Sequence, residues 1–385
     1  MNPFSYGTIV RGDFFYDRKE EGERIVSTLT NGNNMVLFAP RRYGKTSLVF
    51  RVIEELEERG YTCVYMDFLP VYSIETFVSL YISAIEKKQN NIQRLVQIIT
   101  NVVKSIRPKL TFDSSGNPEF GIDLTESNVS IQTLSEVLDL PEKLALSGKK
   151  TIVIFDEFQE ITKLNKFGFE SLLRSKIQQQ QQVNYLFLGS RTHLLNDMFN
   201  NKNRAFYNSA SHMQLGPLPH DDTVAYLQDK FGQSGIGIEL QVALYLIELS
   251  GDIPYYIQLL AAEIWQYIIT SLSSVTRELV DICAERIVEL KKDYYFELFD
   301  HQSVMQKQLL KALIQSGDNI FSAPYTKRFR LSAASTTQKS VLALMDSGII
   351  DKTDSSYFIS DPFFKRFIQN YALLRYALRR NFLLR

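Results

Sequence analysis

Cysteine, histidine and tryptophan are scarce in this chain of 385 residues, which has two cysteines, four histidines and one tryptophan. Cys63 and Cys283 cannot form a disulfide framework, and their apolar neighbours favour buried free thiols in a reducing compartment. The histidines are scattered without metal-ligand spacing, which argues against a zinc site. The sequence therefore gives no reason to expect a disulfide scaffold or a zinc protein.

Long apolar runs are also lacking. No uninterrupted apolar stretch reaches the roughly 18–20 residues that a membrane span needs. The N-terminus lacks the basic region followed by an apolar region that marks a signal peptide. We therefore expect a cytoplasmic protein with no membrane association. The hydrophobic share of 45% suffices for a buried core, and the length allows two or three domains at roughly 100–200 residues each.

The chain has no net charge, because 43 Lys and Arg balance 43 Asp and Glu. This balance excludes a uniformly basic polyelectrolyte. The distribution is uneven, however: residues 301–385 contain 13 Lys and Arg but 5 Asp and Glu, so the rest of the chain is acidic. Positive charge at the C-terminal end suggests an anionic partner there.

Five short apolar runs predict the strands of an α/β sheet, at residues 34–38, 62–68, 150–155, 184–189 and 212–215. Between the first two, Leu48, Val52 and Leu56 fall on one face of a predicted helix, and Gly60 ends that helix. A strand, a turn, a helix and a strand within about 35 residues form a βαβ unit, which implies a parallel sheet.

The regions outside these strands differ in pattern. Residues 71–107 look helical, and residues 108–128 are polar and rich in turn residues, which suggests an inserted hairpin or loop. After Pro217 the pattern is helical to about residue 300.

A third pattern begins at His301. Helical segments at 302–315 and 333–346 precede an alternating stretch at 349–359, which contains a polar turn at 353–356. Helices followed by a short hairpin describe a winged helix. We therefore predict four parts: an α/β core at 1–217, a helical lid at 218–300, a winged helix at 301–363 and a basic terminal helix at 364–385.

The strongest chemical signal is Ala39-Pro-Arg-Arg-Tyr-Gly-Lys-Thr46, between the first predicted strand and its helix. It matches the phosphate-loop pattern G-x-x-x-x-G-K-[ST], except that alanine replaces the first glycine. Backbone N–H groups of such a loop converge on a polyphosphate, together with the positive end of the helix. Lys45 is expected to reach the β- and γ-phosphates, and the hydroxyl of Thr46 to bind Mg²⁺. The other expected nucleotide contacts are Pro40, Arg41, Arg42, Tyr43, Gly44 and Ser47.

A second signal is the pair of acids, Asp156 and Glu157, that follows the strand at 150–155. We expect Asp156 to hold the Mg²⁺ shell through water and Glu157 to act as general base on the attacking water. The second acid is typical of a hydrolysing ATPase, whereas a kinase of small metabolites need not have it. Arg191, after the strand at 184–189, is the candidate γ-phosphate sensor, with Ser190 as the alternative.

Several linked motifs occur in one order along residues 2–265: Asn2-Pro3-Phe4, Tyr6-Gly7, Gly12, Phe14-Phe15, Arg18, Glu21, Ala39–Ser47, Phe155–Gln159, Gly189–Arg191 and Gly251–Tyr256. This set resembles the archaeal-type ATPase family, in the STAND branch of AAA+-like P-loop ATPases. The resemblance implies a P-loop NTPase sheet of order 5-1-4-3-2, a helical lid and a C-terminal winged helix. It further implies that the segment Phe15–Arg18 lies near the adenine and that the turn Gly251–Pro254 belongs to the lid that closes over the nucleotide, which makes Arg18 and Pro254 expected nucleotide contacts.

The sequence departs from the family pattern at two places. The first loop position, commonly glycine, is Ala39. Family members often carry Leu-Tyr-Gly-Arg after the fourth strand, and the corresponding run here, at 205–209, has no arginine, although Arg204 lies nearby. The resemblance therefore implies slow intrinsic hydrolysis, or hydrolysis that relies on a partner.

Together these features predict an ATP-binding and ATP-hydrolysing switch that requires Mg²⁺ and whose lid and winged helix engage a protein partner. Two alternatives stay open: a DNA-associated regulator, and a nucleotide-binding scaffold with little turnover. The winged helix and the basic terminal helix are the candidate contacts for nucleic acid. Assembly into a homo-oligomer is also left open.

Overall fold

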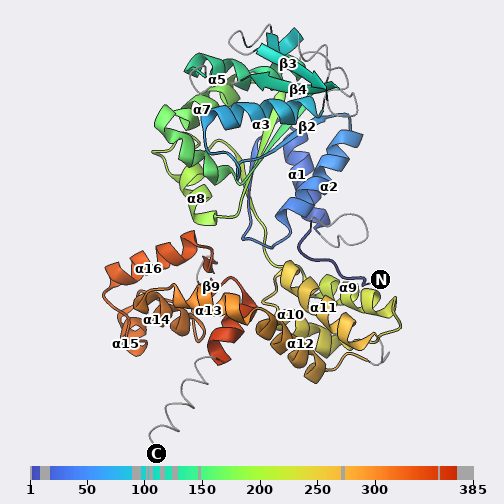
Figure 1. The fold of residues 1–385 in the computed structure, drawn as a ribbon, viewed down its shortest axis with the longest axis vertical. Helices are drawn as coiled ribbons and strands as arrows, with labels where there is room; N and C mark the ends of the chain where they lie inside the picture. The colour runs from blue at the N-terminus through green and yellow to red at the C-terminus, as the bar shows by residue number, and fades with distance from the viewer. Residues whose placement is uncertain are drawn as a thin grey trace, which may run out of the picture. The chain divides into compact units, whose positions relative to one another are not determined.

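A computed structural model describes residues 2–8, 18–88, 97–100, 103, 107–112, 118–123, 129–145, 149–269, 274–353 and 356–370. The chain divides into two compact units (Figure 1). We call Arg18–Pro40 with Lys45–Gly216 the sheet unit, and Met1–Asp17 with Arg41–Gly44 and Pro217–Arg385 the helical unit. Four residues of the predicted phosphate loop thus group with the C-terminal half of the chain.

The sheet unit is built on five parallel strands in the order β2-β5-β6-β1-β7. Their bounds are β1 Met35–Phe38, β2 Thr62–Asp67, β5 Thr151–Asp156, β6 Val183–Gly189 and β7 Ser211–Gln214. Counted along the chain from the β7 edge, this order is 5-1-4-3-2. The predicted parallel P-loop sheet and its strand order are therefore confirmed.

The central strands are mostly apolar because helices cover both of their faces. All residues of β1 and β5 are buried, as expected for a parallel sheet. The register pairs Asp67 with Asp156 and Phe38 with Gly189. The carboxyl ends of four strands therefore meet at one edge of the sheet, where open α/β sheets bind ligands.

Helices lie on both sides of this sheet. In Figure 1, α1 (Lys19–Thr30) and α2 (Lys45–Glu58) lie side by side, and α3 (Ile74–Glu86), α5 (Ile131–Leu138) and α7 (Phe169–Gln179) form a second group. The apolar face predicted for α2 is buried, as is that of α1, a helix the sequence analysis did not predict. The remaining segments are α6 Leu140–Ala145, the 3-10 segment η2 Phe158–Phe167 and α8 Thr192–Asn200.

A small antiparallel hairpin interrupts the sheet unit between α3 and α5. It consists of β3 (Arg107–Phe112) and β4 (Pro118–Asp123). The helical pattern predicted at 71–107 is wrong at its end, because Arg107 already begins β3. The turn expected between these strands falls outside the described residues.

The helical unit contains five consecutive helices after Pro217: α9 His220–Gly232, α10 Leu240–Leu249, α11 Pro254–Ile268, α12 Arg277–Leu290 and α13 Lys292–Asp300. Pro254 suits the first turn of α11, because that position needs no N–H donor. Within the ranges given above, no helix is long and apolar enough to cross a membrane.

A winged helix follows, as predicted. Its elements are α14 Val304–Leu313, α15 Ala323–Arg328, α16 Ala334–Asp346, β8 Ile350–Lys352 and β9 Tyr357–Ile359. β8 and β9 pair antiparallel and form the wing. The terminal helix predicted from 364 begins at 362 and is described to 370, so most of its predicted length lies outside the described residues.

Candidate functional site

The site begins with the loop between β1 and α2. Arg42 and Gly44 have φ values of 74° and 81°, in the left-handed region where glycine is favoured. Lys45 starts α2, whose first N–H groups have no partner within the helix. A turn of this kind before a helix N-terminus is a ready anion-binding site.

Lys45 lies between the two acids of the second motif. Its ammonium is 2.9 Å from Oδ1 of Asp156 and 3.2 Å from Oε1 of Glu157, and its side chain is 7% exposed. Thr46 donates a hydrogen bond of 3.4 Å from its hydroxyl to Oδ2 of Asp156. The sheet thus brings together two pairs of predicted site residues, Lys45 with Thr46 and Asp156 with Glu157, that are more than a hundred positions apart in the sequence.

Glu157 has an unusual backbone conformation, and several donors bind its carboxylate. Its backbone is left-handed, with φ of 49°, which is uncommon for a residue with a side chain. Burial alone would raise the pKa of Glu157, but the charge of Lys45 and hydrogen bonds from Gln159, Ser190 and Lys45 lower it to about 2. The carboxylate is therefore ionised at neutral pH.

Tyr65, which no sequence motif indicates as a site residue, contacts Asp156 from the neighbouring strand. Its hydroxyl donates to Oδ2 of Asp156 at 2.9 Å. Burial, followed by the charge of Asp156, raises the pKa of Tyr65, so the hydroxyl remains a donor. Its place near the carboxyl end of β2 was the only available signal, and the predicted strand at 62–68 did include it.

Asp67 adds a third carboxylate to this edge. Burial raises its pKa, and the charges of Asp156 and Glu157 raise it further. Three acids and one lysine leave the edge with excess negative charge, so an anionic polyphosphate would need a cation beside it. Oxygen atoms of Thr46 and Asp156 suit Mg²⁺, which takes one or two protein oxygens together with phosphates and water.

In the part of the chain that the structure describes, no cluster of three or more His, Cys, Asp or Glu side chains could hold a metal ion by itself.

Two other predicted arginines have partners inside the sheet unit. Arg191 lies 4.0 Å from Glu160 and immediately precedes α8. Arg18 is buried, pairs with Glu21 at 2.7 Å, and donates to the carbonyl of Gly216 at 2.6 Å. Arg18 therefore links the start of α1 to the end of the β7 segment.

Arg204, the arginine nearest to the position where family members carry one, is also engaged. It makes two hydrogen bonds to the buried carboxylate of Glu170, at 3.2 and 2.9 Å, and one to Asp197 at 2.7 Å. The structure thus gives this side chain a role in holding α7 and α8 together.

In the helical unit, Arg42 of the phosphate loop joins a second cluster. Its carbonyl accepts a hydrogen bond of 3.3 Å from the N–H of Tyr255, in the first turn of α11. Its guanidinium lies 5.0 Å from the ring centre of Tyr255 and 4.9 Å from that of Tyr256. It also lies 3.5 Å from Asp361, which accepts a hydrogen bond of 3.2 Å from the hydroxyl of Tyr295.

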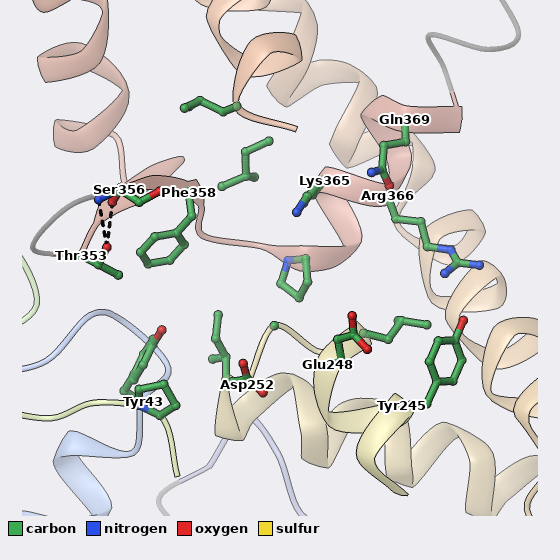
Figure 2. A pocket seen from close by; sticks show the side chains of 17 residues that line it. Tyr43, Tyr245, Glu248, Asp252, Thr353, Ser356, Phe358, Lys365, Arg366 and Gln369 are labelled. Atoms are coloured by element: carbon green, nitrogen blue, oxygen red, sulfur yellow. Dashed lines mark hydrogen bonds between the residues drawn. The ribbon is translucent and has the colours of Figure 1, made fainter. Parts of the chain in front are cut away.

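The neighbouring residue Tyr43 lines a cavity of about 620 Å³ in the same unit. Figure 2 shows Lys365 and Phe358 of the winged-helix region reaching toward it, with Glu248 opposite. Of the other predicted contacts, Pro40 precedes the loop, Arg41 is exposed, Ser47 lies in the first turn of α2, and Pro254 begins α11. The side chain of Arg42 thus contacts Asp361, and Tyr43 lines a cavity that residues of the winged-helix region also line.

Comparisons with known proteins agree with this architecture. An uncharacterized ATP-binding protein of Pyrococcus horikoshii is 24% identical over 224 residues, which span 55% of this chain and 65% of that protein. The chain thus matches slightly less than two thirds of that relative.

Two solved structures show the same fold. The Walker-type ATPase of Pyrococcus abyssi has a TM-score of 0.66 at 18% identity, over 95% of this chain and 99% of that one. The ORC2 protein of Aeropyrum pernix has a TM-score of 0.55 at 14% identity, over 98% of both chains.

Family assignment follows from the extent of the sequence match. Residues 293–370 match a probable winged helix domain. Residues 15–260 match the ATPase domain predominantly from Archaea. The chain belongs to this archaeal ATPase family, with a winged helix at its C-terminal end.

Proposed function

We propose that the protein binds ATP with Mg²⁺ at the loop 39–47, hydrolyses it, and uses the cycle to change the state of its winged helix. The observation that carries the proposal is the cluster of Lys45, Thr46, Asp156 and Glu157 at the carboxyl edge of the sheet. Each of these residue types has a task in phosphoryl transfer, and they contact one another directly.

Binding rests on the loop and the start of α2. The backbone N–H groups of residues 41–46 bind phosphate oxygens, and the ammonium of Lys45 exchanges its two carboxylates for the β- and γ-phosphates. Thr46 and Asp156 hold the magnesium ion, which supplies positive charge to the phosphate oxygens. Arg18 stays the predicted contact on the adenine side, Pro254 stays a predicted contact from the lid, and Arg191 stays the predicted γ-phosphate sensor.

In the hydrolysis step, Glu157 takes a proton from the attacking water. The water oxygen bonds to the γ-phosphorus while the bond from phosphorus to the bridging oxygen of ADP breaks. Arg204 is bound to Glu170 and Asp197, so this arginine is not free to stabilise the transition state. We therefore expect slow turnover until a partner protein supplies the missing charge.

The switch depends on Arg42 and Asp361. Arg42 belongs to the phosphate loop, and Asp361 immediately precedes the helix at 362–370. A conformational change in the loop would therefore alter a contact of the winged-helix region. The contact between these two side chains is 3.5 Å long. ATP shifts the equilibrium away from it if the loop binds phosphate better without the contact.

Turnover of ATP by three proteins tests the enzymatic part. We expect Glu157→Gln to keep ATP binding but reduce turnover by about 100-fold or more, and Lys45→Ala to lose both. Lys149→Ala, an exposed lysine in the same unit, is the control and should behave like the wild type. Unchanged turnover in Lys45→Ala contradicts the site assignment.

A second candidate function is binding of DNA by the winged helix. Polar and basic side chains are exposed on the first turns of α16 and in the segment before it: Ser335, Thr336, Gln338, Lys339, Lys327, Arg328 and Arg330. Such a face could contact phosphates and base edges. The charge is modest, so we expect weak binding that depends on salt.

Anisotropy of a labelled 30-base-pair duplex, measured at several salt concentrations, tests this candidate. Replacing Lys327, Arg328 and Arg330 together by alanine should weaken binding and flatten the salt dependence. Binding that ignores both the salt and the substitutions contradicts it, whereas no binding at all favours a protein partner.

A further inference from the structure

Gln159 is a buried polar residue beside the proposed base. Its side chain is 2% exposed, and it lies in η2, two residues after Glu157. Its amide nitrogen donates to Oε2 of Glu157 at 2.5 Å. Among the described residues, its Oε1 has no hydrogen-bond partner. Burying a polar atom without a hydrogen-bond partner costs folding free energy. The fold would therefore be expected to keep this amide here only if the amide has a function.

The surroundings of Gln159 leave the amide little freedom. A Cβ atom at Gly189, the last residue of β6, would lie 2.1 Å from Oε1 of Gln159 and 2.5 Å from a methyl carbon of Leu195. A side chain at this position would therefore require Gln159 and Leu195 to move from where they lie. The fold thus provides a close-fitting slot in which the amide nitrogen points at Glu157.

The two oxygens of Glu157 have different partners. Oε2 accepts hydrogen bonds from Gln159, from the N–H of Ser190 at 3.2 Å and from its hydroxyl at 2.8 Å. Oε1 contacts the ammonium of Lys45 at 3.2 Å. The donors on Oε2 belong to buried parts of the fold, whereas Lys45 is the residue expected to turn toward phosphates.

We propose that Gln159 is a positioning residue which, with Ser190, fixes Oε2 of Glu157 so that Oε1 alone serves as the base once Lys45 has left it. The inference rests on the proposed role of Glu157. In this structure the ammonium of Lys45 contacts Oε1 at 3.2 Å. When Lys45 binds the phosphates, Oε1 loses this contact while Gln159 and Ser190 still bind Oε2. Oε1 is therefore available as the base only after ATP has bound.

If Gln159 had a purely structural role, its replacement would have different effects. Its loss would lower the unfolding temperature and weaken ATP binding and turnover together. Loss of a positioning residue lowers kcat and leaves the nucleotide affinity and KM nearly unchanged, because the misplaced group acts only in the transition state. The division between kcat and KM therefore separates the two roles.

The experiment compares Gln159→Leu and Ser190→Ala with the wild type in steady-state ATP hydrolysis, with affinity measured by a fluorescent ATP analogue. We expect each variant to lose about 10- to 100-fold in kcat, with KM and affinity within about threefold. Gln258→Leu is the matched control, because Gln258 is also buried but donates to Tyr226 in the helical unit. It should leave kcat unchanged. If Gln159→Leu fails to fold, Ser190→Ala decides.

A double-mutant cycle completes the test. In a Glu157→Gln background, Gln159→Leu should cause no further loss, because the group it positions is already gone. A kcat within twofold of the wild type for both single variants overturns the inference while Glu157→Gln remains inactive. Full turnover of Glu157→Gln itself overturns the proposed base, and this inference with it, so the two failures are distinguishable.

Discussion

Replacing Asp361 with asparagine should loosen the tie between the phosphate loop and the winged helix without unfolding either. The carboxylate lies 3.5 Å from Arg42, and both side chains are partly exposed, at 15% and 41%. An ion pair of this kind contributes about 0.2–1 kcal/mol. Asparagine keeps the cap of the helix at 362–370, because its oxygen can still accept from the N–H groups of Phe363 and Phe364.

The expected effect on ATP follows from that magnitude. If ATP must release the contact, removing it strengthens ATP binding by up to about fivefold, since 1.4 kcal/mol corresponds to tenfold. By reciprocity, ATP should increase amide hydrogen exchange at residues 357–370 in the wild type. Burial, followed by the charge of Asp361, raises the pKa of Tyr295, so this hydroxyl stays protonated in the wild type over the pH range of the assay.

Titration with a fluorescent ATP analogue measures the change in dissociation constant for Asp361→Asn. The control is Asp293→Asn, an exposed acid in the first turn of α13. An unchanged or weaker affinity for ATP in Asp361→Asn refutes the reasoning, because the contact would then be neutral toward the nucleotide or would favour it.

Three further expectations follow from the described contacts. Arg204→Met should lower the free energy of unfolding by about 3 kcal/mol in urea denaturation, because it leaves the carboxylate of Glu170 buried without its partner; a loss below 1 kcal/mol contradicts this. Removal of Mg²⁺ with EDTA should weaken ATP binding by about tenfold or more in calorimetry, since the site has three carboxylates and one lysine; equal affinity without the ion argues against a metal-assisted site. Burial raises the pKa of Cys63 and Cys283 to about 12, from 9.0, so both thiols should resist a thiol reagent at pH 8 until the protein unfolds. Above pH 9 only the unfolded thiols lose protons, so stability should fall between pH 9 and 12.

Much of the sheet unit could be predicted because its strands are continuous apolar runs. β5, for example, reads as Thr151–Asp156 and is buried at every residue. The loop before Lys45 and the acids after β5 are local motifs, and the parallel sheet places their ends at the same edge. α1 was missed, although Ile25, Val26 and Leu29 are its buried residues, because its mean composition is polar.

Contacts between distant segments could not be predicted in the same way. Tyr65 reaches Asp156 across two strands, 91 positions apart. Arg42 and Asp361 are separated by 319 positions, and no sequence motif indicates that they are partners. Gln159 lay within a recognised motif, but its task depends on the glycine at the end of β6, which only the fold reveals.

The most direct test of the central claim is calorimetric titration of ATP with Mg²⁺ into the wild type and Lys45→Ala. If the loop and the two acids form the site, the wild type should bind one ATP per chain in a saturable manner. The affinity for ATP should be at least about tenfold lower in the variant. Equal binding by both proteins, or no heat with the wild type, contradicts the claim that this edge of the sheet holds the nucleotide.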